Sequence, residues 1–192
     1  MTNPILYDLS LNLYSLQNGH WSLMIYPSRT NYGRVFHVRN TDDFDSDKFF
    51  YEERDQGVES GTCVDRSVLT TLSEEQRTHA MQVLRDYASR DENIPRFSQG
   101  RNCQTFVVEC LRRLEEEGLV SGGNADFFEL QCRRAGSEII SSLQAAGRSW
   151  VQSPPREMIE NPDARFHDKE PLRPVGKLRI EDFEGILTNR RR

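Results

Sequence analysis

The 192-residue sequence lacks zinc-binding motifs, long apolar runs and a recognisable leader. It has no C-x-x-C pair and no H-E-x-x-H motif, so neither a metal nor another cofactor is expected. No run approaches the roughly 18 apolar residues of a membrane-spanning helix, so no membrane anchor is expected. A signal peptide is not expected either, because no basic segment precedes residue 5 and Asp8 and Asn12 interrupt the apolar residues. The four cysteines are therefore expected to be reduced thiols in a cytoplasmic protein.

Clustered positive charge is also scarce. The chain has 25 Lys and Arg residues against 30 Asp and Glu residues, a formal net charge of −5. The basic cluster, Arg190–Arg192, lies at the end of the sequence. Nucleic-acid binding is not expected, because contacts to phosphate need clustered cations. The eight acidic residues between Asp42 and Glu59 form either a solvated edge or a segment that repels anionic substrates and membrane surfaces.

Periodicity predicts an antiparallel sheet followed by helices. Leucines alternate with polar residues near the N-terminus, and similar stretches follow after turn residues such as Asn18-Gly19. The predicted strands are residues 5–16, 20–26, 34–39 and 48–54. The predicted helices run over residues 74–89, 103–117 and about 126–146. The fold class expected from this order is α+β.

The composition changes after residue 150. Five prolines lie among charged residues between positions 153 and 174. This composition favours an extended segment over a packed one. We therefore expect a single domain over residues 1–150 and a Pro-rich extended tail over residues 151–192.

Cys103 begins the second predicted helix. Apolar residues recur after it at helical spacing, and Gly118 stands where a C-terminal cap belongs. A thiol in the first turn meets unpaired backbone N–H groups and the positive end of the helix dipole, which both favour the thiolate. The alternative is a small core residue, because free cysteine is often buried. Cys110 lies on the apolar stripe and is expected in the core.

Two histidines precede Cys103 on adjacent predicted strands. His20 and His37 are 17 positions apart. A strand hairpin packed against the start of the Cys103 helix can bring an imidazole within hydrogen-bond reach of the sulfur, as a Cys-His nucleophile requires. The second histidine would orient the first, and the N–H groups of the helix start would supply an oxyanion site. Each histidine taken alone is equally compatible with a turn cap or an ordinary strand residue.

The residues around these positions resemble the permuted papain-like cysteine enzymes of the NlpC-like superfamily. His20-Trp21, His37-Val38 and Asn102-Cys103 follow the order of that group, in which the histidine strand precedes the cysteine helix. The pattern is similar to that of the lecithin:retinol acyltransferase-like and phospholipase/acyltransferase group, and to that of the PPPDE peptidases. The resemblance covers residues 5–120. It implies an antiparallel sheet packed on the cysteine helix, with Cys103 as nucleophile, His20 as general base and His37 as the orienting residue.

The resemblance implies a cysteine-dependent hydrolase or acyltransferase that acts on an amide or thioester through an acyl-enzyme. The acyl substrate would be a small molecule, a peptide or a protein. A lipid acyl-processing enzyme is less favoured, because Gln104-Thr105 replaces the Glu-His of the acyltransferase motif and no hydrophobic C-terminal anchor is present. The alternative from another class is a non-catalytic module that holds a peptide or protein in the same cleft.

Overall fold

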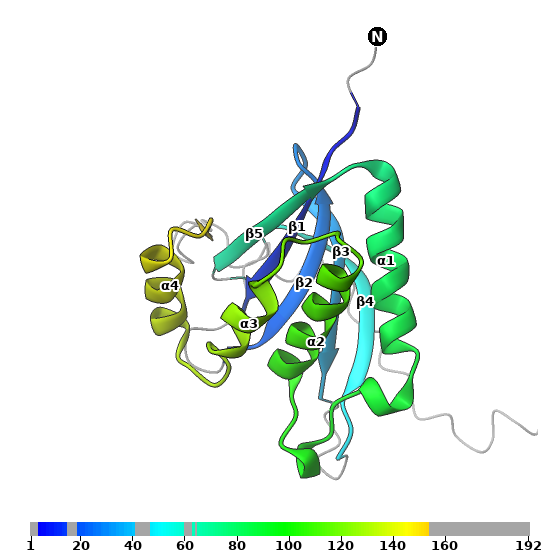
Figure 1. Cartoon of the computed structure of the whole chain (residues 1–192), viewed down its shortest axis with the longest axis vertical. Helices are drawn as coiled ribbons and strands as arrows, with labels where there is room; N and C mark the ends of the chain where they lie inside the picture. The colour runs from blue at the N-terminus through cyan, green and yellow to red at the C-terminus, as the bar shows by residue number, and fades with distance from the viewer. Residues whose placement is uncertain (1–3, 15–18, 41–46, 60–62, 64, 154–192) are drawn as a thin grey trace, which may run out of the picture. The chain divides into compact units, whose positions relative to one another are not determined.

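The computed structural model describes residues 4–14, 19–40, 47–59, 63 and 65–153 (Figure 1). Six strands form one sheet in the order β4-β3-β2-β1-β5-β6, and every neighbouring pair is antiparallel. The strands are β1 (Tyr7–Leu13), β2 (Trp21–Pro27), β3 (Tyr32–Arg39), β4 (Phe50–Gly57), β5 (Asp65–Leu72) and β6 (Val151–Gln152). With the helices that follow, this sheet confirms the predicted α+β class.

Four α-helices and two short 3-10 helices follow β5 in the described chain. They are α1 (Glu74–Ala88), η1 (Asp91–Asn93), η2 (Phe97–Gln99), α2 (Cys103–Glu116), α3 (Asn124–Glu129) and α4 (Gly136–Ala145). Helix α1 begins at the predicted capping box, in which Ser73 and Gln76 satisfy each other's backbone N–H groups. The described part of the chain contains no helix that is long and apolar enough to cross a membrane.

One face of the sheet, here called the helix face, carries the main core. Leu11 of β1, Leu23 of β2 and Phe36 of β3 are paired in register and buried on this face. They form one cluster with residues of α2 such as Phe106 and Leu111. Figure 1 shows α2 and α3 lying over the sheet. Burial of these apolar side chains, each worth about 1.5–3 kcal/mol, is what holds α2 against β2 and β3.

The chain just after β4 packs on the opposite face of the sheet. Strand β4 is at one edge, whereas β5 pairs with β1 beyond two further strands. Val58, just after β4, packs with Met24, Tyr26 and Val35 in a second buried cluster. These three side chains alternate with those of the helix face, so Val58 packs on the opposite side of the sheet.

Three predictions of elements need correction. Strand β5 was not predicted, although it pairs with β1 along its whole length. The predicted helix over residues 126–146 is two helices, because the chain turns at Arg133, whose φ is +68°. The predicted tail begins too early, because β6 pairs with β5. The remaining residues of that tail, 154–192, lie outside the described residues, as does Asn18 of the predicted turn.

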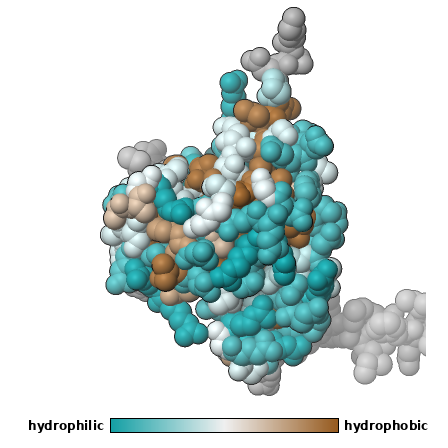
Figure 2. All heavy atoms as spheres, in the orientation of Figure 1, coloured by the Kyte–Doolittle hydropathy of each residue, from teal (hydrophilic) through white to brown (hydrophobic). Residues whose placement is uncertain are grey.

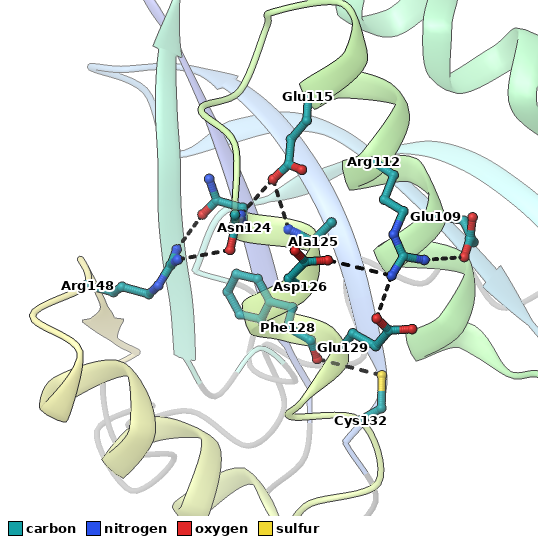
Figure 3. Close-up of polar contacts among 11 residues, drawn as sticks. Glu109, Arg112, Glu115, Asn124, Ala125, Asp126, Phe128, Glu129, Cys132 and Arg148 are labelled. Atoms are coloured by element: carbon teal, nitrogen blue, oxygen red, sulfur yellow. Dashed lines mark hydrogen bonds and ion pairs between the residues drawn. The ribbon is translucent and has the colours of Figure 1, made fainter.

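Helix α3 is fixed on α2 by half-buried and exposed polar contacts (Figure 3). The Glu115 carboxylate accepts hydrogen bonds from the backbone N–H groups of Asn124 (2.6 Å) and Ala125 (2.9 Å) at the start of α3. Farther along, Arg112 forms an ion pair with Glu129. A carboxylate at a helix N-terminus caps unpaired donors and complements the helix dipole. These contacts set the position of the turn that follows α3.

The described surface has few large apolar side chains. Figure 2 shows a mostly hydrophilic face, with hydrophobic atoms gathered near the start of β1. Ile5 and Leu6, which precede that strand, are 63% and 47% exposed. Scattered exposure of this kind is normal for a folded chain and indicates no interface by itself.

Candidate active site

The sheet opens between β2 and β3 at the end that holds His20. Strand β1 pairs with β2 as far as Trp21, and β3 pairs with β4 as far as Arg39. Between β2 and β3, however, the pairing described covers only the three positions from Leu23 to Ile25. The two strands therefore separate over the first residues of β2, and side chains instead of backbone bonds connect them there.

Three side chains form a linear hydrogen-bonded chain across this opening. His20 Nε2 lies 3.0 Å from His37 Nδ1, and His37 Nε2 lies 2.7 Å from Glu52 Oε2. Glu52 is the residue directly opposite His37 in the register of β3 and β4. His37 is buried, His20 is half-buried, and the Glu52 side chain is 28% exposed. The structure thus brings together two of the three site residues expected from the sequence.

The carboxylate at one end fixes the tautomers of both imidazoles. Ionised Glu52 can only accept, so His37 donates its Nε2–H to it. Neutral His37 then has an unprotonated Nδ1, which accepts the Nε2–H of His20. His20 is left with an unprotonated Nδ1. The chain Glu52–His37–His20 therefore ends in a nitrogen that can accept a proton.

Burial keeps both imidazoles neutral. Desolvation lowers the pKa of His20 to about 4, and the neighbouring His37 and Arg54 act in the same direction. Desolvation also lowers the pKa of His37, although its bond to Glu52 opposes the shift. For Glu52, partial burial acts to raise the pKa, but the hydrogen bond from His37 and the nearby Arg54 and Arg39 lower it overall. At neutral pH Glu52 is therefore ionised, and the His37 and His20 rings are neutral.

Cys103 is the first residue of α2, as expected. Its position is fixed by the N-cap Asn102, whose Oδ1 accepts from the backbone N–H groups of Gln104 (3.0 Å) and Thr105 (3.2 Å). Thr105 Oγ1 in return accepts from the Asn102 N–H, at 2.9 Å. This reciprocal capping box starts the helix at Cys103 and orients the first turn.

The Cys103 sulfur lies beside the start of β2. The backbone N–H groups of Trp21, Gln104 and Cys103 itself are near enough to lower its pKa. The Trp21 N–H points away from β1 because the carbonyl of the same peptide unit, His20 O, accepts from Tyr14 N at 3.0 Å. That N–H faces the opening where β3 is not paired. The structure thus places the sulfur next to the residue that follows His20.

The expectation that Cys103 is a thiolate at rest is wrong, because the thiol is largely buried. Burial raises the pKa of Cys103 above its ordinary value, and the three backbone N–H groups offset this only in part. In the described part of the chain no hydrogen bond connects Cys103 Sγ to the His20 ring. At rest Cys103 is therefore a neutral thiol and His20 a neutral imidazole.

The other cysteines and histidines have simpler settings. Cys110 is fully buried in the core, as predicted, and burial raises its pKa strongly. Cys132 is half-buried after α3, and burial raises its pKa to about 11. His79 pairs with Glu117 at 3.2 Å on the exposed side of α1, and His167 lies outside the described residues. Among the residues that the structure describes, no cluster of three His, Cys, Asp or Glu side chains could hold a metal ion.

Sequence reasoning does not identify two parts of this arrangement. Glu52 appears in the sequence as one of eight acidic residues, and only its register opposite His37 distinguishes it. The backbone N–H of Trp21 carries no side-chain signal at all. A histidine on one strand and acidic residues on the next could have suggested Glu52, if the register of the two strands had been known.

A family model matches residues 9–121, more than half of the chain and a range that contains His20, His37, Glu52 and Cys103. The model is described as a family of unknown function, DUF6540. No curated protein and no solved structure gave a significant match. The chain belongs to the DUF6540 family.

Proposed function

We propose that this protein is a cysteine-dependent hydrolase or acyltransferase with a permuted papain-like fold of the NlpC-like type. The observation that carries the proposal is the Glu52–His37–His20 chain, which ends in a proton-accepting nitrogen beside the strand start that contacts Cys103 Sγ. A nucleophile, a base and a group that orients the base are the minimum for acyl transfer. The substrate class is an amide or a thioester.

In the proposed reaction, Cys103 attacks the carbonyl carbon of the substrate. His20 Nδ1 takes the thiol proton as the C–S bond forms, and the carbonyl oxygen becomes an oxyanion. The backbone N–H groups of Cys103 and Trp21, which already lie at the sulfur, are the donors for that oxyanion. His20 then gives its proton to the leaving amine or thiol as the C–N or C–S bond of the substrate breaks. Water or an acceptor, deprotonated by His20, releases the acyl group from Cys103.

The Glu52–His37–His20 chain, here called the relay, matters when the His20 imidazole becomes protonated. Its low pKa of about 4 keeps it unprotonated at neutral pH but also makes it a weak base when isolated. The positive charge that forms during reaction is stabilised by Glu52, whose carboxylate holds His37 at 2.7 Å. A carboxylate that orients and stabilises an imidazolium has the same effect in the Ser-His-Asp arrangement. The raised pKa of Cys103 fits proton transfer during attack, without a preformed thiolate.

The test is the position of the acyl group after reaction with simple acyl donors. We expect p-nitrophenyl acetate and an N-acetylcysteamine thioester to acylate Cys103, detected by intact mass and by peptide mapping. Cys103→Ser should abolish the adduct. Cys132→Ser is the matched control, because both cysteines are half-buried and free. An adduct on Cys132, or none on Cys103 after prolonged incubation, would contradict the proposal.

A second candidate is a peptide-binding module that uses the same opening of the sheet. It is favoured by the raised pKa of Cys103 and by the missing hydrogen bond between its sulfur and His20 in the described structure. Such a module would bind extended peptides along the opening without acylation. It predicts that Cys103→Ser keeps peptide binding, whereas the enzyme proposal predicts that turnover is lost.

A further inference from the structure

Gln104, the residue after the proposed nucleophile, has both ends of its side chain bonded to other segments. It is 4% exposed. Its Nε2 donates to the backbone oxygen of Gly19 at 2.8 Å, and its Oε1 accepts from the backbone N–H of Arg133 at 2.7 Å. These partners are 85 and 29 positions away in sequence. One buried amide therefore connects the start of α2 to the segment before His20 and to the turn after α3.

The contact between Gln104 and Gly19 is so close that position 19 has no room for a side chain. Gly19 has φ +48°, and a Cβ added there would lie 2.7 Å from Gln104 Nε2. A glycine adopts this backbone conformation without the cost that other residues incur. The backbone therefore approaches the amide directly, one residue before the proposed base. Any shift of Gln104 would be passed to His20 through a single peptide unit.

The turn after α3 forms the other side of this arrangement. Arg133 has a positive φ of +68°, which is uncommon for a residue other than glycine. Its backbone bonds Gln104, and its guanidinium donates to Gly100 O at 3.1 Å. The turn is thus attached both before and after Cys103. The contacts of α2 with α3 in Figure 3 fix the helix that precedes this turn.

We propose that Gln104 is a positioning residue that sets the approach of His20 to Cys103. This inference rests on the proposed function. Gln104 contacts no reacting atom; it acts by fixing the Gly19 backbone relative to the first turn of α2. A misplacement of about 1 Å between a nucleophile and its base can lower a rate by about 100-fold. Loss of the amide should therefore lower the acylation rate without changing affinity for the acyl donor.

The experiment is a double-mutant cycle on the saturating rate of Cys103 acylation by p-nitrophenyl acetate at pH 7. The variants are Gln104→Met, His20→Asn and the double variant. Gln131→Met is the matched control, because Gln131 is also 4% exposed and its Nε2 also donates to a backbone oxygen, that of Phe127 at 3.2 Å. We expect Gln104→Met to lower the rate by roughly 10–100-fold with the half-saturating concentration unchanged. It should have almost no further effect in the His20→Asn background.

The outcomes separate the two claims. Suppose that the rate depends on His20 but is the same for Gln104→Met as for Gln131→Met. That result would overturn this inference while the proposed function stands. Equal and independent reductions in both His20 backgrounds would also overturn it, because they indicate general loss of structure. Equal rates for wild type and His20→Asn would overturn the proposed function and this inference together. If Gln104→Met does not fold, Gln104→Glu replaces it: an ionised carboxylate keeps the acceptor for Arg133 N–H but cannot donate to Gly19 O.

Discussion

Glu52 gives the relay its direction, because it is the one member that is charged at neutral pH. Its carboxylate accepts from His37, which fixes the proton positions on both imidazoles. The adjacent Glu53 lies on the helix face and binds Arg85 at 2.5 Å instead. Two neighbouring carboxylates on one strand therefore have unrelated environments.

We predict that Glu52→Gln lowers the rate of Cys103 acylation by roughly tenfold or more, because the amide can donate to His37 and thereby allows the wrong tautomer. The measurement is the acylation rate under saturating donor. Glu53→Gln is the matched control and should lower stability without lowering this rate. A Glu52→Gln rate equal to that of wild type would show that the relay does not orient His20.

At this scale, sequence reasoning identifies the residues but not their state. The spacing of His20 and His37 predicts that they meet, and their ring nitrogens lie 3.0 Å apart. The same reasoning assigns Cys103 a lowered pKa from its place at a helix start, whereas burial raises it. The desolvation of a side chain depends on residues distant in sequence, such as Trp21, and no local pattern reports it.

The start of α2 is the element on which the site depends. Asn102 caps two backbone N–H groups, and Thr105 completes the capping box. Helix α1 has an equivalent box, formed by Ser73 and Gln76, far from the site. The two boxes allow the effect of capping on stability to be separated from its effect on the site.

We predict that Asn102→Ala and Ser73→Ala each lower the free energy of unfolding by about 1 kcal/mol, the usual cost of losing an N-cap. Urea denaturation at pH 7 measures this. Only Asn102→Ala should also slow the acylation of Cys103, because it loosens the turn that carries the sulfur. Equal acylation rates for the two variants would mean that the cap stabilises the helix but does not position the site.

The elements that local patterns predict are those with regular periodicity. Strand β1 follows from alternation, β2 and β3 from apolar stretches bounded by turn residues, and α1 and α2 from their caps and apolar spacing. Strand β5 was missed because three of its central residues are only half-buried and give no clear alternation. The break between α3 and α4 depends on Arg133, whose positive φ is supported by a tertiary hydrogen bond to Gln104. Neither signal exists in the local sequence.

For the whole domain, neutral buried histidines predict a loss of stability in acid. The unfolded chain takes up a proton on His20 near pH 6.5, whereas the folded chain does so only near pH 4. Between these values the unfolded state binds more protons, so stability falls as the pH falls from about 6.5 to 4. His37 shifts in the same direction. Asp65 acts in the opposite direction, because burial raises its pKa to about 6.

We predict that wild type loses about 3 kcal/mol more stability than His20→Asn between pH 6.5 and 4, the magnitude that follows from the shift in pKa. Urea unfolding at several pH values measures the difference, in which the contribution of Asp65 cancels. His79→Asn, which removes an exposed histidine, is the matched control. Parallel curves for wild type and His20→Asn would mean that His20 is not desolvated in the folded protein.

The most direct test of the central claim is the pH dependence of Cys103 acylation by p-nitrophenyl acetate, compared between wild type and His20→Asn. If His20 is the base, its low pKa leaves it unprotonated throughout the neutral range, so the wild-type rate should be nearly constant from about pH 5.5 to 8. Without His20 only the thiolate reacts, so the variant's rate should rise about tenfold per pH unit up to the raised pKa of Cys103. A wild-type rate that rises just as steeply, and coincides with that of His20→Asn, would contradict the account.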